Sequence, residues 1–260
     1  DLGPAGKGVA GSFTVGNTLP GLIDRQRLPL NSLTGRLAWQ DSTTRLEDLK
    51  AALPGGSELA GSGQWQNDGL ELDLSARNLD VSKIVSSLRS TRLNGPISAT
   101  LSTQQQAIKL DLKDSRFTVL AEASLSGQRL SLPRLEIGTG QARLTAKGEL
   151  SLDKAMAFSA EGELSRFDPS QFAKAPAALI NARFSTQGKL SPRPIIDGRF
   201  ELLDSKMAGE PLAGRGQLSI DWPRIPQADI QLTAGPNKLN AKGAFGRPGT
   251  GVVGSTSPKE

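Results

Sequence analysis

Apolar and polar residues alternate along most of the chain. The stretch from Leu144 to Leu164, LTAKGELSLDKAMAFSAEGEL, alternates, is interrupted near its middle, and then alternates again. Between Ala142 and Leu152 the even positions carry apolar residues or glycine, and the odd positions carry polar residues. Because successive side chains of a strand point to opposite faces, this period of two predicts strands with one apolar and one polar face.

A short phrase, apolar-x-small-x-Gly-x-apolar, recurs within the alternating segments. It begins at Leu59 and Leu144, and then at Phe158, Phe184, Leu212 and Leu239, where the starts are spaced by about 27 residues. Fixed periods of roughly 20–50 residues are typical of repeat arrays. The glycine of the phrase indicates a bulge, a bend or a strand end where a side chain would crowd, rather than the approach of a ligand.

A longer repeat joins residues 79–84 (LDVSKI) with residues 167–172 (FDPSQF). In each copy an aspartate follows an apolar residue and can accept hydrogen bonds from the first backbone N–H groups of a helix. Pro169 stands at the first helical position, where its missing N–H costs nothing, and Gln171 has the spacing of a capping box. The pattern predicts short helices that interrupt the strands.

The residue types that are missing narrow the chemistry. The chain of 260 residues contains no Cys, His or Tyr, and aromatic residues make up 4% of it. These absences exclude thiolate and imidazole metal sites, Cys and Ser-His nucleophiles, and tyrosyl acid-base catalysis. We therefore expect no enzyme, no catalytic residue, no metal and no cofactor.

Charge and hydropathy exclude two further classes. The formal net charge is +5, but the basic residues are dispersed among acidic ones, so we expect no nucleic-acid partner. No apolar run approaches the ~20 residues of a spanning helix. The first residues, DLGPAGKGVAG, have neither the basic region nor the apolar region of a signal peptide, so we expect a fragment of a longer protein.

Several candidate motifs have a simple structural interpretation. Asp111 and Asp114, like Glu161 and Glu163, are close in sequence and could be proposed as acid-base pairs. Positions two apart in a strand, such as Glu161 and Glu163, share the solvent face, so a solvated polar face is the better interpretation. The glycine-rich stretch at 138–140 lacks the Gly-Lys-Ser/Thr of a phosphate loop and is expected to be a turn.

The tryptophans and one basic segment complete the candidates. Trp39, Trp65 and Trp222 occupy positions of apolar parity, so we expect their rings to pack inside the sheet. The segment at 24–30, DRQRLPL, is basic and contains a proline, and it is either a surface loop or a contact for anionic headgroups.

At residues 188–200, GKLSPRPIIDGRF, the sequence resembles the repeat of the TamB family, the translocation and assembly module. The likeness rests on a Gly-x-Leu, a proline a few residues on, and then apolar-x-Gly-x-apolar. It extends to residues 19–40, 57–84 and 92–101 and covers most of residues 12–245. Single motifs are loose, and their order makes them moderately specific.

The resemblance implies a periplasmic protein of a Gram-negative bacterium, anchored in the inner membrane by an N-terminal part that this chain lacks. It implies a β-taco, a sheet folded lengthwise around an apolar groove, which belongs to the wider group of AsmA-like, bridge-like lipid transfer proteins. The family is linked to phospholipid passage between the membranes and to the assembly of outer-membrane proteins, including autotransporters. The part of the family that is associated with its outer-membrane barrel partner, TamA, is not recognisable here.

Periodicity alone fits a closed sandwich, a transmembrane barrel and an open groove equally well. A barrel normally carries aromatic girdles, which a chain with no Tyr and three Trp does not supply. We therefore expect an all-β, elongated β-taco repeat with an apolar groove and a few short helices. It should extend over residues 1–245, frayed at 1–11, with a flexible tail at 246–260.

The first functional hypothesis is a non-enzymatic conduit whose groove holds phospholipid acyl chains. The second is a scaffold whose strand edges receive incoming strands of outer-membrane β-barrel proteins. For the conduit, the residues expected to line the groove are Leu72, Leu74, Leu110, Leu112, Val119, Leu144, Leu150, Phe158, Phe184, Phe200, Ile220, Ile230 and Leu232.

Overall fold

The computed structural model describes residues 2–5, 8–40, 43–171, 177–246 and 251–256. The chain divides into two compact units, unit 1 (Asp1–Gly127) and unit 2 (Gln128–Glu260), where the sequence indicated one continuous segment. The described residues form antiparallel strands joined by turns, with single turns of 3-10 helix. The predicted all-β fold class is confirmed.

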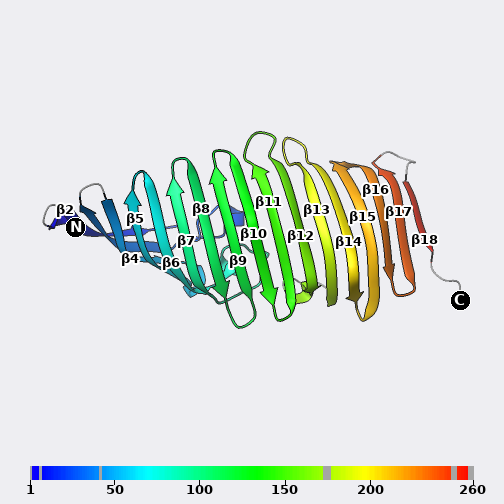
Figure 1. The fold of residues 1–260 in the computed structure, drawn as a ribbon, viewed down its shortest axis with the longest axis horizontal. Helices are drawn as coiled ribbons and strands as arrows, with labels where there is room; N and C mark the ends of the chain where they lie inside the picture. The colour runs from blue at the N-terminus through cyan, green and yellow to red at the C-terminus, as the bar shows by residue number, and fades with distance from the viewer. Residues whose placement is uncertain (1, 6–7, 41–42, 172–176, 247–250, 257–260) are drawn as a thin grey trace. The chain divides into compact units, whose positions relative to one another are not determined.

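Each strand of unit 1 pairs antiparallel with the next strand along the chain (Figure 1). Such a meander arises because every alternating segment is followed by a turn that returns the chain beside it. The strands of unit 1 are β1 (Leu2–Ala5), β2 (Gly8–Gly16), β3 (Ser32–Gln40), β4 (Thr43–Ala52), β5 (Glu58–Gln66), β6 (Gly69–Leu79), β7 (Leu93–Ser102), β8 (Gln105–Lys113) and β9 (Thr118–Ser126).

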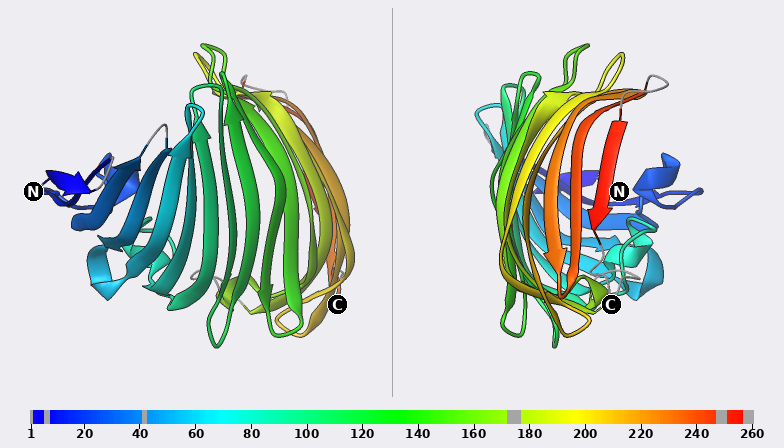
Figure 2. Two further views of the ribbon diagram at one scale, coloured as in Figure 1. Left: turned by 60° about the vertical axis from the view of Figure 1, so that its left-hand side comes forward. Right: turned by 90° about the vertical axis from the view of Figure 1, so that its right-hand side faces the viewer.

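Unit 2 repeats this sequential pairing with longer strands, which are visibly bowed along their length in Figure 2. The phrase found in the sequence therefore marks successive strands of one meander. Its strands are β10 (Arg129–Thr139), β11 (Ala142–Ser151), β12 (Ala157–Phe167), β13 (Ala178–Lys189), β14 (Ile195–Met207), β15 (Glu210–Asp221), β16 (Arg224–Ala234), β17 (Asn237–Phe245) and β18 (Gly251–Thr256).

The short helices predicted from the longer repeat are present as single 3-10 turns, η3 (Val81–Lys83) and η4 (Pro169–Gln171). The carboxylate of Asp80 accepts from the backbone N–H of Ser82 at 3.0 Å. The side chain of Gln171 lies outside the described residues. Two further turns, η1 (Ile23–Arg25) and η2 (Pro54–Gly56), lie in the connections after β2 and β4.

The longer repeat is also a repeat of backbone geometry. β6 and β12 each carry a β-bulge near their ends, where Asn78 (φ 52°) and Arg166 (φ 48°) have left-handed backbones. The N–H of Asn78 donates to Oδ1 of Asn94 at 3.0 Å, and that of Arg166 donates to Oδ1 of Asn181 at 2.7 Å. Each bulge adds one residue to its strand, so the next apolar residue returns to the apolar face.

Both ends of the chain contain strands where the sequence indicated irregular structure. β1 lies within residues 1–11, which were expected to be frayed, and β2 begins there, continues to Gly16 and pairs with β3 from Val9 onward. β18 lies within residues 246–260, expected to be a tail, and pairs with β17. These strands were missed because glycine-rich segments alternate weakly, whereas pairing with a neighbouring strand supplies the hydrogen bonds.

The two strand ends of unit 1 differ. At the loop end, β2, β4, β6 and β8 finish in the longer connections; at the hairpin end, β5 and β7 finish in tight turns. The buried apolar side chains of unit 1 gather toward the loop end, and they are Leu49, Ala76, Leu79, Leu93, Ile97, Leu112 and Phe117. Unit 2 has a thinner core, with Ala182, Leu212 and Ala228 as the buried apolar residues among those described.

Candidate functional site

The apolar face of unit 2 is assembled by strand register. Directly paired residues share a face, so Phe184 and Phe200, which pair across β13 and β14, lie on the same face. Leu150 pairs with Phe158 in the same way. Following these pairs from strand to strand places all of the predicted unit 2 residues on one face, and they are Leu144, Leu150, Phe158, Phe184, Phe200, Ile220, Ile230 and Leu232.

Glycines on this face make room for the phenylalanine rings. A Cβ on Gly162 would lie 2.6 Å from Cζ of Phe184, and one on Gly216 would lie 2.5 Å from Cε1 of Phe200. Each ring therefore lies over the bare backbone of a neighbouring strand. The glycine of the repeated phrase has a structural role, as expected: Gly162 and Gly216 lie inside their strands, whereas Gly188 lies next to the end of β13.

The predicted residues of unit 2 are all half-buried. A residue in the interior of a closed sandwich would be covered by the opposite sheet and lose nearly all of its exposure. Among the described residues of unit 2, no second layer of strands covers this face. The apolar face of unit 2 is therefore open, and an apolar patch of this extent is uncommon on a soluble surface that has no partner.

The apolar face of unit 1 contains the remaining predicted residues. Leu72 and Leu74 lie on β6, Leu110 and Leu112 on β8, and Val119 pairs with Leu112. Register places all five on one face. Leu112 is only 3% exposed, whereas the other four are half-buried. The face is thus closed toward the loop end and open toward the hairpin end.

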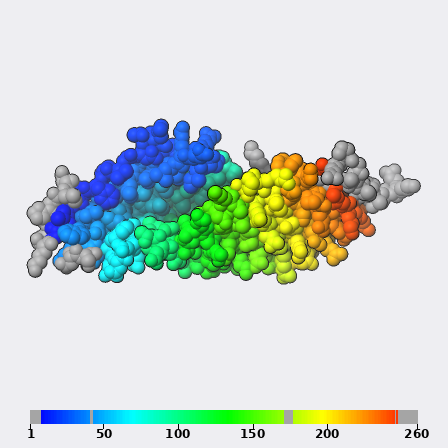
Figure 3. All heavy atoms as spheres, turned by 90° about the horizontal axis from the view of Figure 1, so that it is seen from above, coloured from blue at the N-terminus to red at the C-terminus, as the bar shows by residue number. Residues whose placement is uncertain are grey.

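Two loops that are far apart in sequence meet at the loop end of unit 1. The β2–β3 loop (residues 17–31) and the β6–β7 loop (residues 80–92) are joined where the N–H of Ile23 donates to the carbonyl oxygen of Ile84 at 2.9 Å. The hydroxyl of Ser86 also donates to the carboxylate of Asp24. The sheet of unit 1 must bend to bring these loops together, and Figure 3 shows the hollow between its blue and cyan parts.

The carboxylate of Asp80 fixes the shape of the β6–β7 loop. Besides Ser82, it accepts hydrogen bonds from the hydroxyl of Ser90 at 2.9 Å and from the N–H of Thr91 at 3.2 Å. Partial burial raises the pKa of Asp80, but these hydrogen bonds together outweigh that effect and hold the pKa below its ordinary value. The charged carboxylate is therefore part of the folded loop.

The hairpin end of unit 1 carries exposed tryptophans, contrary to the sequence-based expectation of packed rings. Trp39 and Trp65 lie in one row of the apolar face, each paired with Thr44, and are 48% and 45% exposed. Trp222 follows β15 in a turn and is 63% exposed. The expectation was wrong because parity assigns a face, whereas burial of the last row requires a covering layer that the hairpin end lacks.

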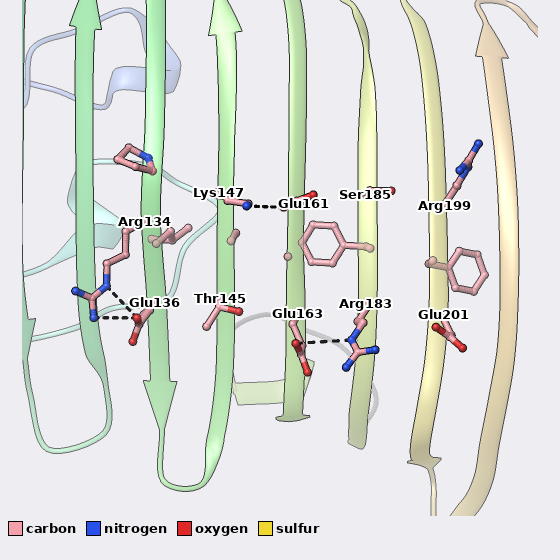
Figure 4. A pocket seen from close by; sticks show the side chains of 16 residues that line it. Arg134, Glu136, Thr145, Lys147, Glu161, Glu163, Arg183, Ser185, Arg199 and Glu201 are labelled. Atoms are coloured by element: carbon pink, nitrogen blue, oxygen red, sulfur yellow. Dashed lines mark hydrogen bonds and ion pairs between the residues drawn. The ribbon is translucent and has the colours of Figure 1, made fainter.

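The opposite face of unit 2 is charged and ion-paired (Figure 4). Nζ of Lys147 lies 2.7 Å from a carboxylate oxygen of Glu161, and Nε of Arg183 lies 3.8 Å from one of Glu163. The bond and the charge of Glu161 raise the pKa of Lys147. A shallow hollow lies over these rows of side chains. The predicted polar face at Glu161 and Glu163 is confirmed, and the hollow is lined by their charged rows together with apolar side chains such as Phe184 and Phe200.

Other sequence candidates also have structural roles. Asp114 accepts from the N–H groups of Arg116 and Phe117, each at 2.7 Å, and shapes the β8–β9 turn. Of the turn predicted at 138–140, only Gly140 (φ 58°) lies in a turn, because Gly138 and Thr139 still belong to β10. In the part of the chain that the structure describes, no group of acidic side chains is arranged to hold a metal ion, and no helix is long and apolar enough to cross a membrane.

Sequence reasoning missed the closed end of unit 1 and the tryptophan row. A signal for an ordered loop was present in the apolar residues Leu19, Leu22 and Ile23 of the β2–β3 loop, which turns normally lack. The described residues of each unit thus form one apolar face. Comparisons with known protein families, with curated proteins and with solved structures found no match to this chain.

Proposed function

We propose that the apolar faces of the two units carry phospholipid acyl chains, as a segment of a TamB-like bridge between the inner and outer membranes. One observation carries this proposal: the apolar face of unit 2 is continuous across its strands and half-exposed. The catalytic residue types absent from the chain support a binding role rather than an enzymatic one.

The free energy of acyl-chain binding suits the passage of lipid along the apolar face better than its storage there. Burying one methylene stabilises by about 0.8 kcal/mol, so an acyl chain gains on the order of 10 kcal/mol on leaving water for such a face. A bilayer interior offers nearly the same gain. Exchange between bilayer and protein is then close to neutral, so that lipid enters and leaves without a large barrier in free energy.

The resemblance to the TamB repeat supplies the setting of the proposal. The protein would be periplasmic, anchored at the inner membrane, and would act in outer-membrane biogenesis. Its ligand would be the acyl chains of phospholipids, with neither a cofactor nor a nucleic acid involved. Assembly of β-barrel proteins by strand addition is the alternative, which requires a free strand edge instead of an open apolar face.

The test uses the tryptophans as built-in reporters. A brominated single-chain phospholipid, below its critical micelle concentration, is titrated into the protein. Bromine quenches indole fluorescence on contact, so Trp39 and Trp65, on the apolar face of unit 1, should be quenched, and Trp222, in a turn of unit 2, should not. Variants W222F and W39F/W65F separate the two signals. Quenching confined to Trp222, or none at all, would contradict the proposal.

A pair of adjacent substitutions tests unit 2 by vesicle-to-vesicle lipid transfer. Leu144 lies on the apolar face and Thr145 on the charged face. Leu144→Arg places a charge on the acyl path and should lower transfer about tenfold or more, since desolvating a charge costs several kcal/mol. Thr145→Arg should leave transfer unchanged. Equal effects of the two, with both variants folded by circular dichroism, would sink the proposal.

A further inference from the structure

Large apolar side chains are exposed at the loop end of unit 1. Leu19 and Leu28 of the β2–β3 loop are 67% and 61% exposed, Ile23 is 56% exposed, and Leu88 of the β6–β7 loop is 48% exposed. A single exposed leucine is ordinary on a protein surface. These four come from two loops whose backbones are hydrogen-bonded to each other, so they belong to one region.

Hydrogen bonds fix the backbone that carries these exposed apolar side chains. The N–H of Gly21 and the side-chain amide of Asn17 each donate to the carbonyl oxygen of Leu28 at 3.2 Å, which ties the two arms of the β2–β3 loop together beside Leu19. Ile23 is fixed by its bond to Ile84. The exposed side chains therefore stand on a shaped backbone rather than on an unstructured connection.

Exposed basic side chains accompany the apolar ones. A Cβ on Gly21 would lie 2.6 Å from Cδ of Arg27, and one on Gly55 would lie 2.8 Å from Cγ of Lys83. The aliphatic stems of both side chains thus lie against glycine backbone, while both residues remain exposed. Arg25 is exposed as well.

The acidic residues of the two loops are engaged within them. The carboxylate of Asp24 accepts from Ser86, and this bond lowers the pKa of Asp24. Asp80 accepts from Ser82, Ser90 and Thr91. Arginine and lysine outnumber aspartate and glutamate over residues 17–31 and 80–92. The exposed leucine and isoleucine side chains of the loop end therefore lie in a region of net positive charge.

From these observations we infer that the paired β2–β3 and β6–β7 loops form a contact surface for an anionic lipid bilayer. Leucine and isoleucine side chains enter the boundary between headgroups and acyl chains, while the arginine and lysine heads remain beside the lipid phosphates. The charge complementarity selects a negatively charged surface. This contact is separate from the carriage of acyl chains on the sheet faces and does not depend on it.

The experiment is flotation of the full chain with two kinds of vesicle, phosphatidylcholine alone and phosphatidylcholine mixed with phosphatidylglycerol. The protein should float with the anionic vesicles and be released by added salt. L19S/L28S should lower the partition coefficient for anionic vesicles about tenfold or more, since the apolar side chains that enter the bilayer are replaced by polar ones. R25Q/R27Q should remove the preference for anionic over neutral vesicles.

A matched control uses exposed leucines elsewhere. Leu152 and Leu190 lie in connections of unit 2 and are also exposed, so L152S/L190S should float like the unchanged protein. Absence of flotation with anionic vesicles, or equal flotation of L19S/L28S and the control, would overturn the inference. Loss of a protein partner in the loop variants, without any vesicle binding, would also overturn it and assign the surface to a protein.

The same variants distinguish this inference from the proposed function. Quenching of Trp39 and Trp65 by the brominated single-chain lipid reports on the apolar face and not on the loops. L19S/L28S should therefore keep full quenching while losing flotation. Loss of quenching with flotation intact would contradict the acyl-chain proposal and leave the bilayer contact standing.

Discussion

The two units have the same strand pattern, but their apolar faces are buried to different extents. In unit 1 the face is buried at the loop end, where two connections meet through Ile23 and Ile84, and exposed at the hairpin end. In unit 2 the face is half-exposed along most of its extent, with few buried apolar residues. The same alternating pattern is thus compatible with an apolar face that is buried at one end and with an apolar face that is open. The two units differ in the connections between their strands.

The difference shows how a sheet without a second layer remains ordered. Unit 1 gains a local core from its loops, with Leu79 and Leu93 paired beneath them. Unit 2 gains contacts within the face, because the rings of Phe184 and Phe200 cover glycines on neighbouring strands. Burial against loops contributes more stability per residue than half-burial on an open face, since the hydrophobic gain scales with the area removed from water.

The largest expected effect comes from truncating one leucine in each unit. Leu112 of unit 1 is 3% exposed, so Leu112→Ala should cost about 2–5 kcal/mol of unfolding free energy. Leu232 of unit 2 is half-buried, so Leu232→Ala should cost about 1 kcal/mol. Urea unfolding followed by tryptophan fluorescence measures both. Equal costs would mean that the two faces are covered alike and would remove the contrast between the units.

A smaller effect is expected from adding one methyl group to two glycines of unit 2. A Cβ on Gly162 would lie 2.5 Å from the carbonyl oxygen of Thr145 and 2.6 Å from the Phe184 ring, so Gly162→Ala should cost about 1–3 kcal/mol. On Gly198 the same Cβ would meet only the carbonyl oxygen of Leu218, at 4.0 Å. Gly198→Ala should be neutral or slightly stabilising. A similar cost at both positions would show that ring-over-glycine packing does not hold the open face.

The smallest expected effect is the pH dependence of the stability of unit 1, at its loop end. Partial burial raises the pKa of Asp80 and of Asp114, but hydrogen bonds outweigh it and both pKa values lie below the ordinary value of 3.8. A carboxyl with a lowered folded pKa stabilises fully above its unfolded pKa and loses this contribution as pH falls through the folded value. The urea midpoint that Trp39 and Trp65 report should therefore decrease as the pH is lowered below about 4.

A variant isolates that pH effect. In D80N/D114N neither position titrates, so the midpoint of unit 1 should depend less steeply on pH below about 4 than in the unchanged protein. The W222F background restricts the signal to unit 1, whose tryptophans are Trp39 and Trp65. An unaltered slope would show that other carboxylates govern the acid sensitivity and that these two do not stabilise the closed end.

Much of the fold follows from local pattern and was predicted from the sequence. Most of the strands, their apolar and polar faces and the single-turn helices after Asp80 and Asp168 were expected, because each depends on residues within a few positions of one another. The candidate site was placed on the correct parity for the same reason. The bulge at Asn78 was not predicted, since its geometry depends on a hydrogen bond with Asn94, which lies on the next strand.

By itself the sequence determined which side chains share a face, because the period of two is a property of the extended backbone. Leu110 and Leu112 illustrate what it left to the tertiary structure. They stand two positions apart on β8, with the same parity, yet Leu110 is half-buried and Leu112 is buried. The buried end of the face is the one at which residues 17–31 meet residues 80–92. Coverage is a long-range property, because it depends on segments that are far apart in the sequence.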